Sequence, residues 1–170
     1  MRSSVGDDTA FCIRANAELP LSGTALREVL SATLARGRVC RFCARGSSMT
    51  PFVLDGDIIT LAPLTRPPAV GDIVAFVRPG GGSLVVHRVI GRRGHLFDIA
   101  GDNDPWCTDS SIPIQSILGR IVKLERQGRT IRTGLGPERR LVALLARFGV
   151  LQKSVHLFSF IFHYRRRRQV

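Results

Sequence analysis

The chain has 170 residues, of which 44% are hydrophobic and 22% are charged, a composition typical of one folded domain with its own core. Its net charge of +12 is unusual and comes almost wholly from arginine, since lysine occurs only at Lys123 and Lys153. Such a charge favours nucleic acid or an anionic membrane surface as a neighbour. The sequence has no recognisable DNA-binding motif and no interleaving of aromatic with basic residues, so we expect no nucleic-acid partner.

Residues 1–37 are predicted to form an N-terminal segment with one helix. Ser22 or Thr24 can cap this helix, and Gly37 is expected to end it. Its apolar positions fall at helical spacing: Leu26, Val29, Leu30 and Leu34. Asp7 and Asp8 come early, and no apolar run of signal-peptide type follows them, so we expect the chain to start and stay on the cytoplasmic side.

Residues 38–134 are predicted to form a β domain. Short runs rich in valine and isoleucine alternate with turn residues, as expected for a small antiparallel barrel or coiled sheet. Pro79 to Gly82 reads as the tip of a hairpin. The strand candidates are residues 39–44, 52–54, 58–61, 73–77, 83–90, 96–100, 117–124 and 130–133.

Residues 135–170 are predicted to form an apolar helical tail. Leu141, Leu144, Leu145, Phe148 and Leu151 keep helical spacing, and four arginines end the apolar run that follows. Three arrangements stay open: a helix lying in the plane of an anionic membrane surface, a helix packed on the β domain, and a span over residues 141–163. The first favours a protein on the cytoplasmic side that is associated with the membrane through this tail.

The cysteines do not indicate a metal site. Cys40 and Cys43 form a C-x-x-C pair, but no second pair lies at zinc-binding spacing. In a strand, positions three apart point to opposite faces, so the two thiols are poorly placed to share a metal ion. We therefore expect ordinary thiols, no bound metal and no cofactor.

Five sequence blocks between Arg45 and Val122 carry candidate chemistry. In chain order they are Gly46 to Pro51, Asp55 to Asp57, Gly71 to Phe76, Val85 to Ile90, and Gly101 to Asn103. Together they resemble the signal peptidase I family, and within it the branch that uses histidine as the base. The resemblance implies a serine endopeptidase on a mainly β fold, with Ser48 as the nucleophile.

The base implied by this resemblance is His87. A serine hydroxyl is a weak nucleophile at neutral pH and needs a base within hydrogen-bond reach. Lys123 and Lys153 lie outside the block that supplies the base in the family. Histidine titrates near neutral pH when it is unperturbed, so it can act without strong desolvation.

The resemblance also assigns supporting roles. Asp102 matches the aspartate that orients the histidine, and Asp109 lies about one residue from where the branch has another acid. The backbone N–H of Ser48 is the natural first oxyanion donor, and the second is left open between a backbone N–H near Gly46 and the hydroxyl of Ser47. Further implied groove residues are Met49 and Pro51.

The family resemblance implies cleavage of a precursor protein or peptide after small residues. Two alternatives stay open. One is a self-cleaving regulator of the repressor-protease type, a group that shares the broader fold and the glycine at position 46. The other is a relative that binds peptide or membrane and cuts nothing, in which case Ser48→Ala would behave as the wild type.

Overall fold

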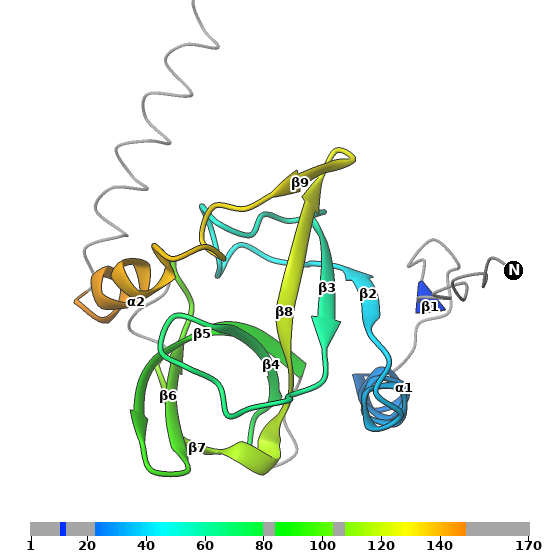
Figure 1. Cartoon of the computed structure of the whole chain (residues 1–170), viewed down its shortest axis with the longest axis horizontal. Helices are drawn as coiled ribbons and strands as arrows, with labels where there is room; N and C mark the ends of the chain where they lie inside the picture. The colour runs from blue at the N-terminus through cyan, green and yellow to red at the C-terminus, as the bar shows by residue number, and fades with distance from the viewer. Residues whose placement is uncertain (1–10, 13–22, 80–83, 104–107, 149–170) are drawn as a thin grey trace, which may run out of the picture.

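The computed structural model describes residues 11–12, 23–79, 84–103 and 108–148. They form a mainly β structure of nine strands in one sheet, with two α-helices and one short 3-10 helix (Figure 1). The strands are β1 (Phe11–Cys12), β2 (Cys40–Cys43), β3 (Ile58–Ala62), β4 (Ile73–Val77), β5 (Leu84–Arg93), β6 (Leu96–Ala100), β7 (Asp109–Pro113), β8 (Ile117–Arg126) and β9 (Arg129–Ile131). The helices are α1 (Gly23–Ala35), the 3-10 helix (Ile114–Ser116) and α2 (Arg139–Arg147).

The sheet follows an open path in the order β1-β2-β3-β8-β4-β5-β6-β7, and β9 pairs with the end of β8. All pairs are antiparallel except β1 with β2. The path curls, so that β4 to β7 wrap around one side of the molecule (Figure 1). The predicted antiparallel coiled sheet is confirmed at the level of a mainly β, open antiparallel sheet.

Two apolar clusters fill the interior because successive side chains of a strand point to opposite faces. On β4, Ile73 and Ala75 belong to the cluster under α1, which also holds Leu30. Val74 and Phe76 belong to the second cluster, which the inner faces of β5, β6 and β7 complete. Both faces of β4 are therefore buried, which explains its unbroken apolar sequence.

Most predicted elements are confirmed, and several begin or end within a few residues of the expected positions. The N-terminal helix ends at Ala35, and Gly37 follows with φ +74°, a conformation that favours glycine. The hairpin of β4 and β5 pairs as predicted. Helix α2 lies in the first part of the predicted tail, whereas residues 149–170 lie outside the described residues.

The strand prediction for residues 52–54 is wrong. Residues 52–54 form turns, in which the N–H groups of Phe52 and Val53 both donate to the carbonyl of Met49. The apolar run there reflects a buried Val53 and not a strand. Strand β7 was not predicted, because its sequence Asp-Ser-Ser-Ile-Pro has only one buried apolar position, Ile112.

Helix α2 packs one face on the sheet and leaves the other face to solvent. Ala146 meets Ile90 of β5 and Ala100 at the end of β6. The opposite face exposes Leu141, Leu144 and Phe148. Within the described residues, neither α-helix has the length and apolar character needed to cross a membrane.

Candidate active site

The loop between β2 and β3 carries Ser48 and is closed at its base by two backbone hydrogen bonds. Ala44 N–H donates to the Asp57 carbonyl at 2.7 Å, and Gly56 N–H donates to the Ala44 carbonyl at 3.0 Å. Inside the loop, Gly46 N–H donates to Asp55 Oδ1 at 2.9 Å. Gly46 has φ +94°, which L-residues rarely adopt, so the glycine is required by the shape of the loop.

The loop after β6 supports Ser48 from a second direction. Asn103 N–H donates to the Ser48 carbonyl at 2.8 Å, and Asn103 Nδ2 donates to the Ser47 carbonyl at 3.3 Å. A Cβ on Gly101 would lie 2.7 Å from the Ser48 carbonyl oxygen, closer than side chains come in proteins. The block Gly101 to Asn103 thus fixes the backbone of the nucleophile loop by close packing and hydrogen bonds.

His87 lies on β5 opposite Val74 of β4, and only 4% of its surface is exposed. Its Nε2 lies 3.0 Å from Ser48 Oγ, within hydrogen-bond distance, although 39 positions separate the two residues. With its ring proton on Nδ1, neutral His87 accepts the Ser48 hydroxyl proton at Nε2. The structure therefore brings together the two residues that the sequence singled out as nucleophile and base.

Asp109 is the carboxylate that lies beside the other ring nitrogen. Its Oδ2 is 3.7 Å from His87 Nδ1, longer than a hydrogen bond but close enough for electrostatic attraction. Arg78 holds the same carboxylate with two hydrogen bonds, from Nε at 2.8 Å and from Nη2 at 3.1 Å. Asp109 begins β7, and Arg78 directly follows β4.

Asp102 does not occupy the place that an orienting acid requires, and this corrects the sequence-based expectation. Both of its oxygens accept hydrogen bonds at 2.8 Å from Arg88, the residue next to His87 on β5. Asp102 and Arg88 are completely buried. Burial raises the pKa of the Asp102 carboxyl, and the hydrogen bonds and charge of Arg88 oppose that rise.

An apolar groove of about 360 Å³ leads to Ser48. One wall is the edge of β5 from Leu84 to Val86, and the other is the segment from Phe42 to Gly46, which joins β2 to the nucleophile loop. Residues 84–87 pair with β4 on one edge, whereas the pairing of β5 with β6 begins only at Arg88. In the described part of the chain, no strand covers this stretch of the β5 edge.

The remaining predicted groove residues divide into two groups. Met49 is buried and lines the groove. Gly46 also lines the groove but is exposed. Ser47 and Pro51 are exposed and do not line it. The Gly46 N–H donates to Asp55 Oδ1, so the second oxyanion donor stays open between the Ser47 hydroxyl and another backbone N–H near Gly46.

The lysines stand apart from this geometry. Lys123 on β8 contacts Glu125 Oε1 at 3.0 Å, and Lys153 lies outside the described residues. Among the described residues, no cluster of histidine, cysteine and acidic side chains could hold a metal ion.

Sequence reasoning missed two arginines that organise the site, Arg78 and Arg88. For Arg88 a signal was available, because a charged residue inside an otherwise apolar strand needs a buried partner. For Arg78 no signal was available, since it directly follows β4 in a position where a solvated arginine is equally ordinary.

Comparison with known proteins adds no assignment: neither protein-family models nor curated proteins give a match to this chain.

Proposed function

We propose that this protein is a serine endopeptidase in which Ser48 is the nucleophile and His87 the general base. The observation that carries the proposal is the 3.0 Å contact between Ser48 Oγ and His87 Nε2 at the end of an apolar groove. A hydroxyl and an imidazole in this relation are the minimum that nucleophilic catalysis of acyl transfer needs.

The proposed reaction begins with attack of Ser48 Oγ on the carbonyl carbon of the scissile peptide bond, while its proton passes to His87 Nε2. The C–N bond then breaks, and His87 gives the proton to the departing amine. Water, deprotonated by His87, hydrolyses the acyl ester and restores Ser48. The negative charge of Asp109 beside Nδ1 stabilises the imidazolium that forms in both halves of the reaction.

The proposed substrate binds as an extended chain along the uncovered edge of β5. Backbone groups of residues 84–86 are placed to pair with such a chain, in the manner of a strand added to a sheet. The buried Met49, Val53 and Ile59 line the groove and favour apolar side chains. Cleavage after small residues in a protein or peptide precursor is proposed from the resemblance to signal peptidases.

Incubation with a library of peptides of mixed sequence, followed by mass spectrometry of new termini, tests this function. We expect the wild type to generate new termini with apolar or small residues before the cut, and Ser48→Ala to generate none. Identical peptide patterns for both proteins would leave a protein that binds peptides without cutting them, and the proposal would fall.

A further inference from the structure

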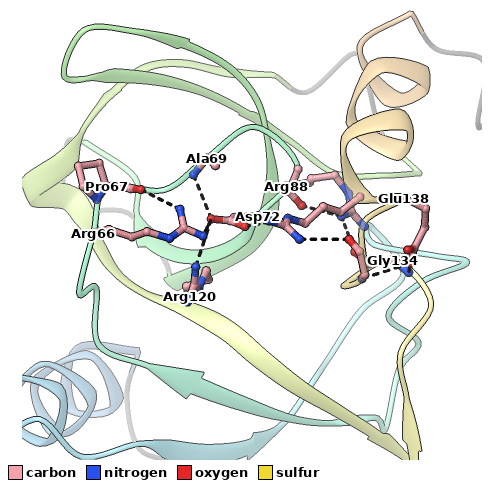
Figure 2. A network of polar contacts seen from close by, with 11 residues as sticks. Arg66, Pro67, Ala69, Asp72, Arg88, Arg120, Gly134 and Glu138 are labelled. Carbon is pink, nitrogen blue, oxygen red and sulfur yellow. Dashed lines mark hydrogen bonds and ion pairs between the residues drawn. The ribbon is translucent and has the colours of Figure 1, made fainter.

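We propose that the cavity between the start of β4, β8 and α2 is a binding site for a phosphate group, with Arg120 and Arg139 as its ligands. This site is separate from Ser48 and His87, and the proposal does not depend on proteolysis. It begins from a cluster of three arginines around Asp72, namely Arg66, Arg120 and Arg139. Figure 2 shows two of them, Arg66 and Arg120, beside Asp72.

The three arginines share the single carboxylate of Asp72 from three directions. Arg66 Nη2 lies 3.4 Å and Arg120 Nη1 lies 3.6 Å from Asp72 Oδ2, while Arg139 Nε lies 3.2 Å from Oδ1. The Asp72 side chain is almost completely buried, and the Ala69 N–H also donates to it at 3.0 Å. Three cations against one anion leave a local excess of positive charge.

These contacts differ from those of three other arginine–aspartate pairs among the described residues. Arg88, Arg78 and Arg126 each form two hydrogen bonds to one carboxylate, at 2.8–3.1 Å. Within the described residues, none of the contacts to Asp72 from Arg66, Arg120 and Arg139 has hydrogen-bond geometry. The three guanidinium groups are thus held beside Asp72 by charge, while Arg66 Nη1 donates to the Pro67 carbonyl and Arg139 Nη1 donates to the Gly136 carbonyl.

Two of the arginines have donors available for a ligand. The Arg120 guanidinium forms no hydrogen bond in the described part of the chain, although only 28% of its side chain is exposed. The Arg139 Nε is buried and has no hydrogen-bond partner there. Buried donors without partners cost free energy, and an anion that accepts from them would remove that cost.

A cavity lies where those donors meet. It has a volume of about 310 Å³, and its lining includes Asp72, Arg120 and Arg139 together with the apolar Val122 and Leu135. Gly71, which also lines the cavity, packs tightly against the backbone of Arg139. A Cβ added to Gly71 would lie 2.7 Å from the Arg139 carbonyl oxygen. The Gly71 carbonyl in turn accepts a hydrogen bond from Arg88.

A phosphate group suits this arrangement better than a carboxylate. The planar guanidinium fork matches two oxygens of one anion, and two arginines at different angles match a tetrahedral anion with more than two acceptors. The Asp72 carboxylate already lies between the three arginines. A bound anion therefore has to compete with Asp72 for the guanidinium groups, and a doubly charged phosphate competes better than a singly charged carboxylate. The phosphate can belong to a soluble phosphate ester or to a lipid headgroup, because the recognising chemistry is the same.

Thermal unfolding of the full chain in inorganic phosphate, against chloride at equal ionic strength, tests the site. We expect a saturable rise of Tm with phosphate, because a ligand that binds only the folded state stabilises it. Arg120→Gln and Arg139→Gln should each weaken phosphate binding about tenfold or more, as the loss of one charge-assisted hydrogen bond does. Arg129→Gln is the matched control, since Arg129 is an exposed arginine of β9 and should change nothing.

A variant that is expected to bind phosphate more tightly shows whether the other variants lose binding only because they fold poorly. Asp72→Asn removes the competing carboxylate, so we expect a lower Tm in chloride and a larger rise of Tm with phosphate than in the wild type. No response to phosphate in the wild type, or an equal loss in Arg129→Gln and Arg120→Gln, would overturn the proposal. The second result would assign the effect to the general positive charge.

Vesicles separate the two sources of phosphate. Phosphatidylcholine vesicles with and without phosphatidic acid are sedimented with the wild type, Arg120→Gln and Arg129→Gln. Binding that requires phosphatidic acid and is lost only in Arg120→Gln identifies a lipid headgroup as the ligand. Vesicle binding unaffected by Arg120→Gln, together with the expected response to inorganic phosphate, identifies a soluble phosphate.

Discussion

Two neighbouring residues of β5, His87 and Arg88, serve regions of opposite character. His87 Nε2 lies 3.0 Å from Ser48 Oγ at the end of a groove, whereas Arg88 donates four hydrogen bonds in a fully buried network. Consecutive side chains of a strand point to opposite faces, so one strand serves both regions. A charged residue next to a candidate catalytic residue in the sequence, as Arg88 is next to His87, therefore need not take part in the proposed reaction.

The difference between these regions predicts which substitutions remove activity and which remove the fold. In the dyad region, Ser48→Ala removes one hydroxyl that lies 3.0 Å from His87 Nε2 and leaves the backbone hydrogen bonds of the loop in place. The Arg88 region joins the carbonyls of Gly71 and Gly134 to Asp102, and the Arg88 guanidinium also lies 5.2 Å from the centre of the Phe52 ring. Loss of Arg88 should therefore disturb several elements at once.

The largest expected effect is on activity, in the dyad region. Ser48→Ala and His87→Ala should each lower the rate of peptide cleavage by about a thousandfold or more, because the nucleophile and its base act as a unit. The Tm of Ser48→Ala should stay close to that of the wild type, because only one hydroxyl is removed. Lys123→Ala is the control and should keep the wild-type rate; a strong loss in this variant would contradict the assignment of the base.

The next effect is on stability, in the Arg88 region. Arg88→Met should lower the free energy of unfolding by about 3–5 kcal/mol, because it leaves the buried Asp102 without its partner. Arg93 lies on the same strand as Arg88 and forms an exposed ion pair with Asp98 of β6. Arg93→Met removes this pair and should lower the free energy of unfolding by less than about 1 kcal/mol. Urea unfolding of both variants measures the difference, and equal costs would show that the Arg88 network is not special.

A smaller effect on activity should follow from the acid beside His87. Asp109→Asn should lower kcat about tenfold to a hundredfold with little change in KM, since its role is to stabilise the imidazolium. The acidic limb of the pH–rate profile should move to lower pH, because a neighbouring negative charge is lost. Asp98→Asn is the matched control; an unchanged profile in Asp109→Asn would remove Asp109 from the mechanism.

The smallest effect concerns the ion pair between Asp57 and Arg126, which holds the start of β3 against the end of β8. Burial acts to raise the pKa of Asp57, but hydrogen bonds from Arg126 and the Leu54 N–H and the charge of Arg126 outweigh it, so the pKa lies below its ordinary value. The folded state therefore gains stability above the ordinary carboxyl range near pH 4, and loses it as the pH falls through the lowered pKa. Asp57→Asn should flatten the acid side of a plot of unfolding free energy against pH; an unchanged slope would contradict this.

The sequence predicted the dyad and most of the sheet for a physical reason. Apolar alternation and turn residues are local signals, and they located β4, β6 and β8 closely. Ser48 and His87 were found because their sequence blocks resemble a known pattern. The partner of His87 was predicted wrongly as Asp102, because a Gly-Asp pair after a strand does not reveal which way its carboxylate points.

The arginine network could not be predicted, because the arginines that pair with each aspartate come from distant positions. The pair Gly71-Asp72 is ordinary turn chemistry, yet Asp72 gathers Arg66, Arg120 and Arg139 from three separate parts of the chain. With 23 arginines in the chain, the sequence offers too many candidates for each carboxylate. Only the register of β4 with β8 brings Arg120 close to the start of β4.

The central claim is that the Ser48 hydroxyl is activated by His87, and covalent labelling tests it most directly. The wild type and His87→Ala are treated with a fluorophosphonate, digested and analysed by mass spectrometry for the peptide that contains Ser48. The account predicts one phosphonylated serine in the wild type, at position 48, and none in His87→Ala. An unlabelled Ser48 in the wild type, or equal labelling in both proteins, would contradict it.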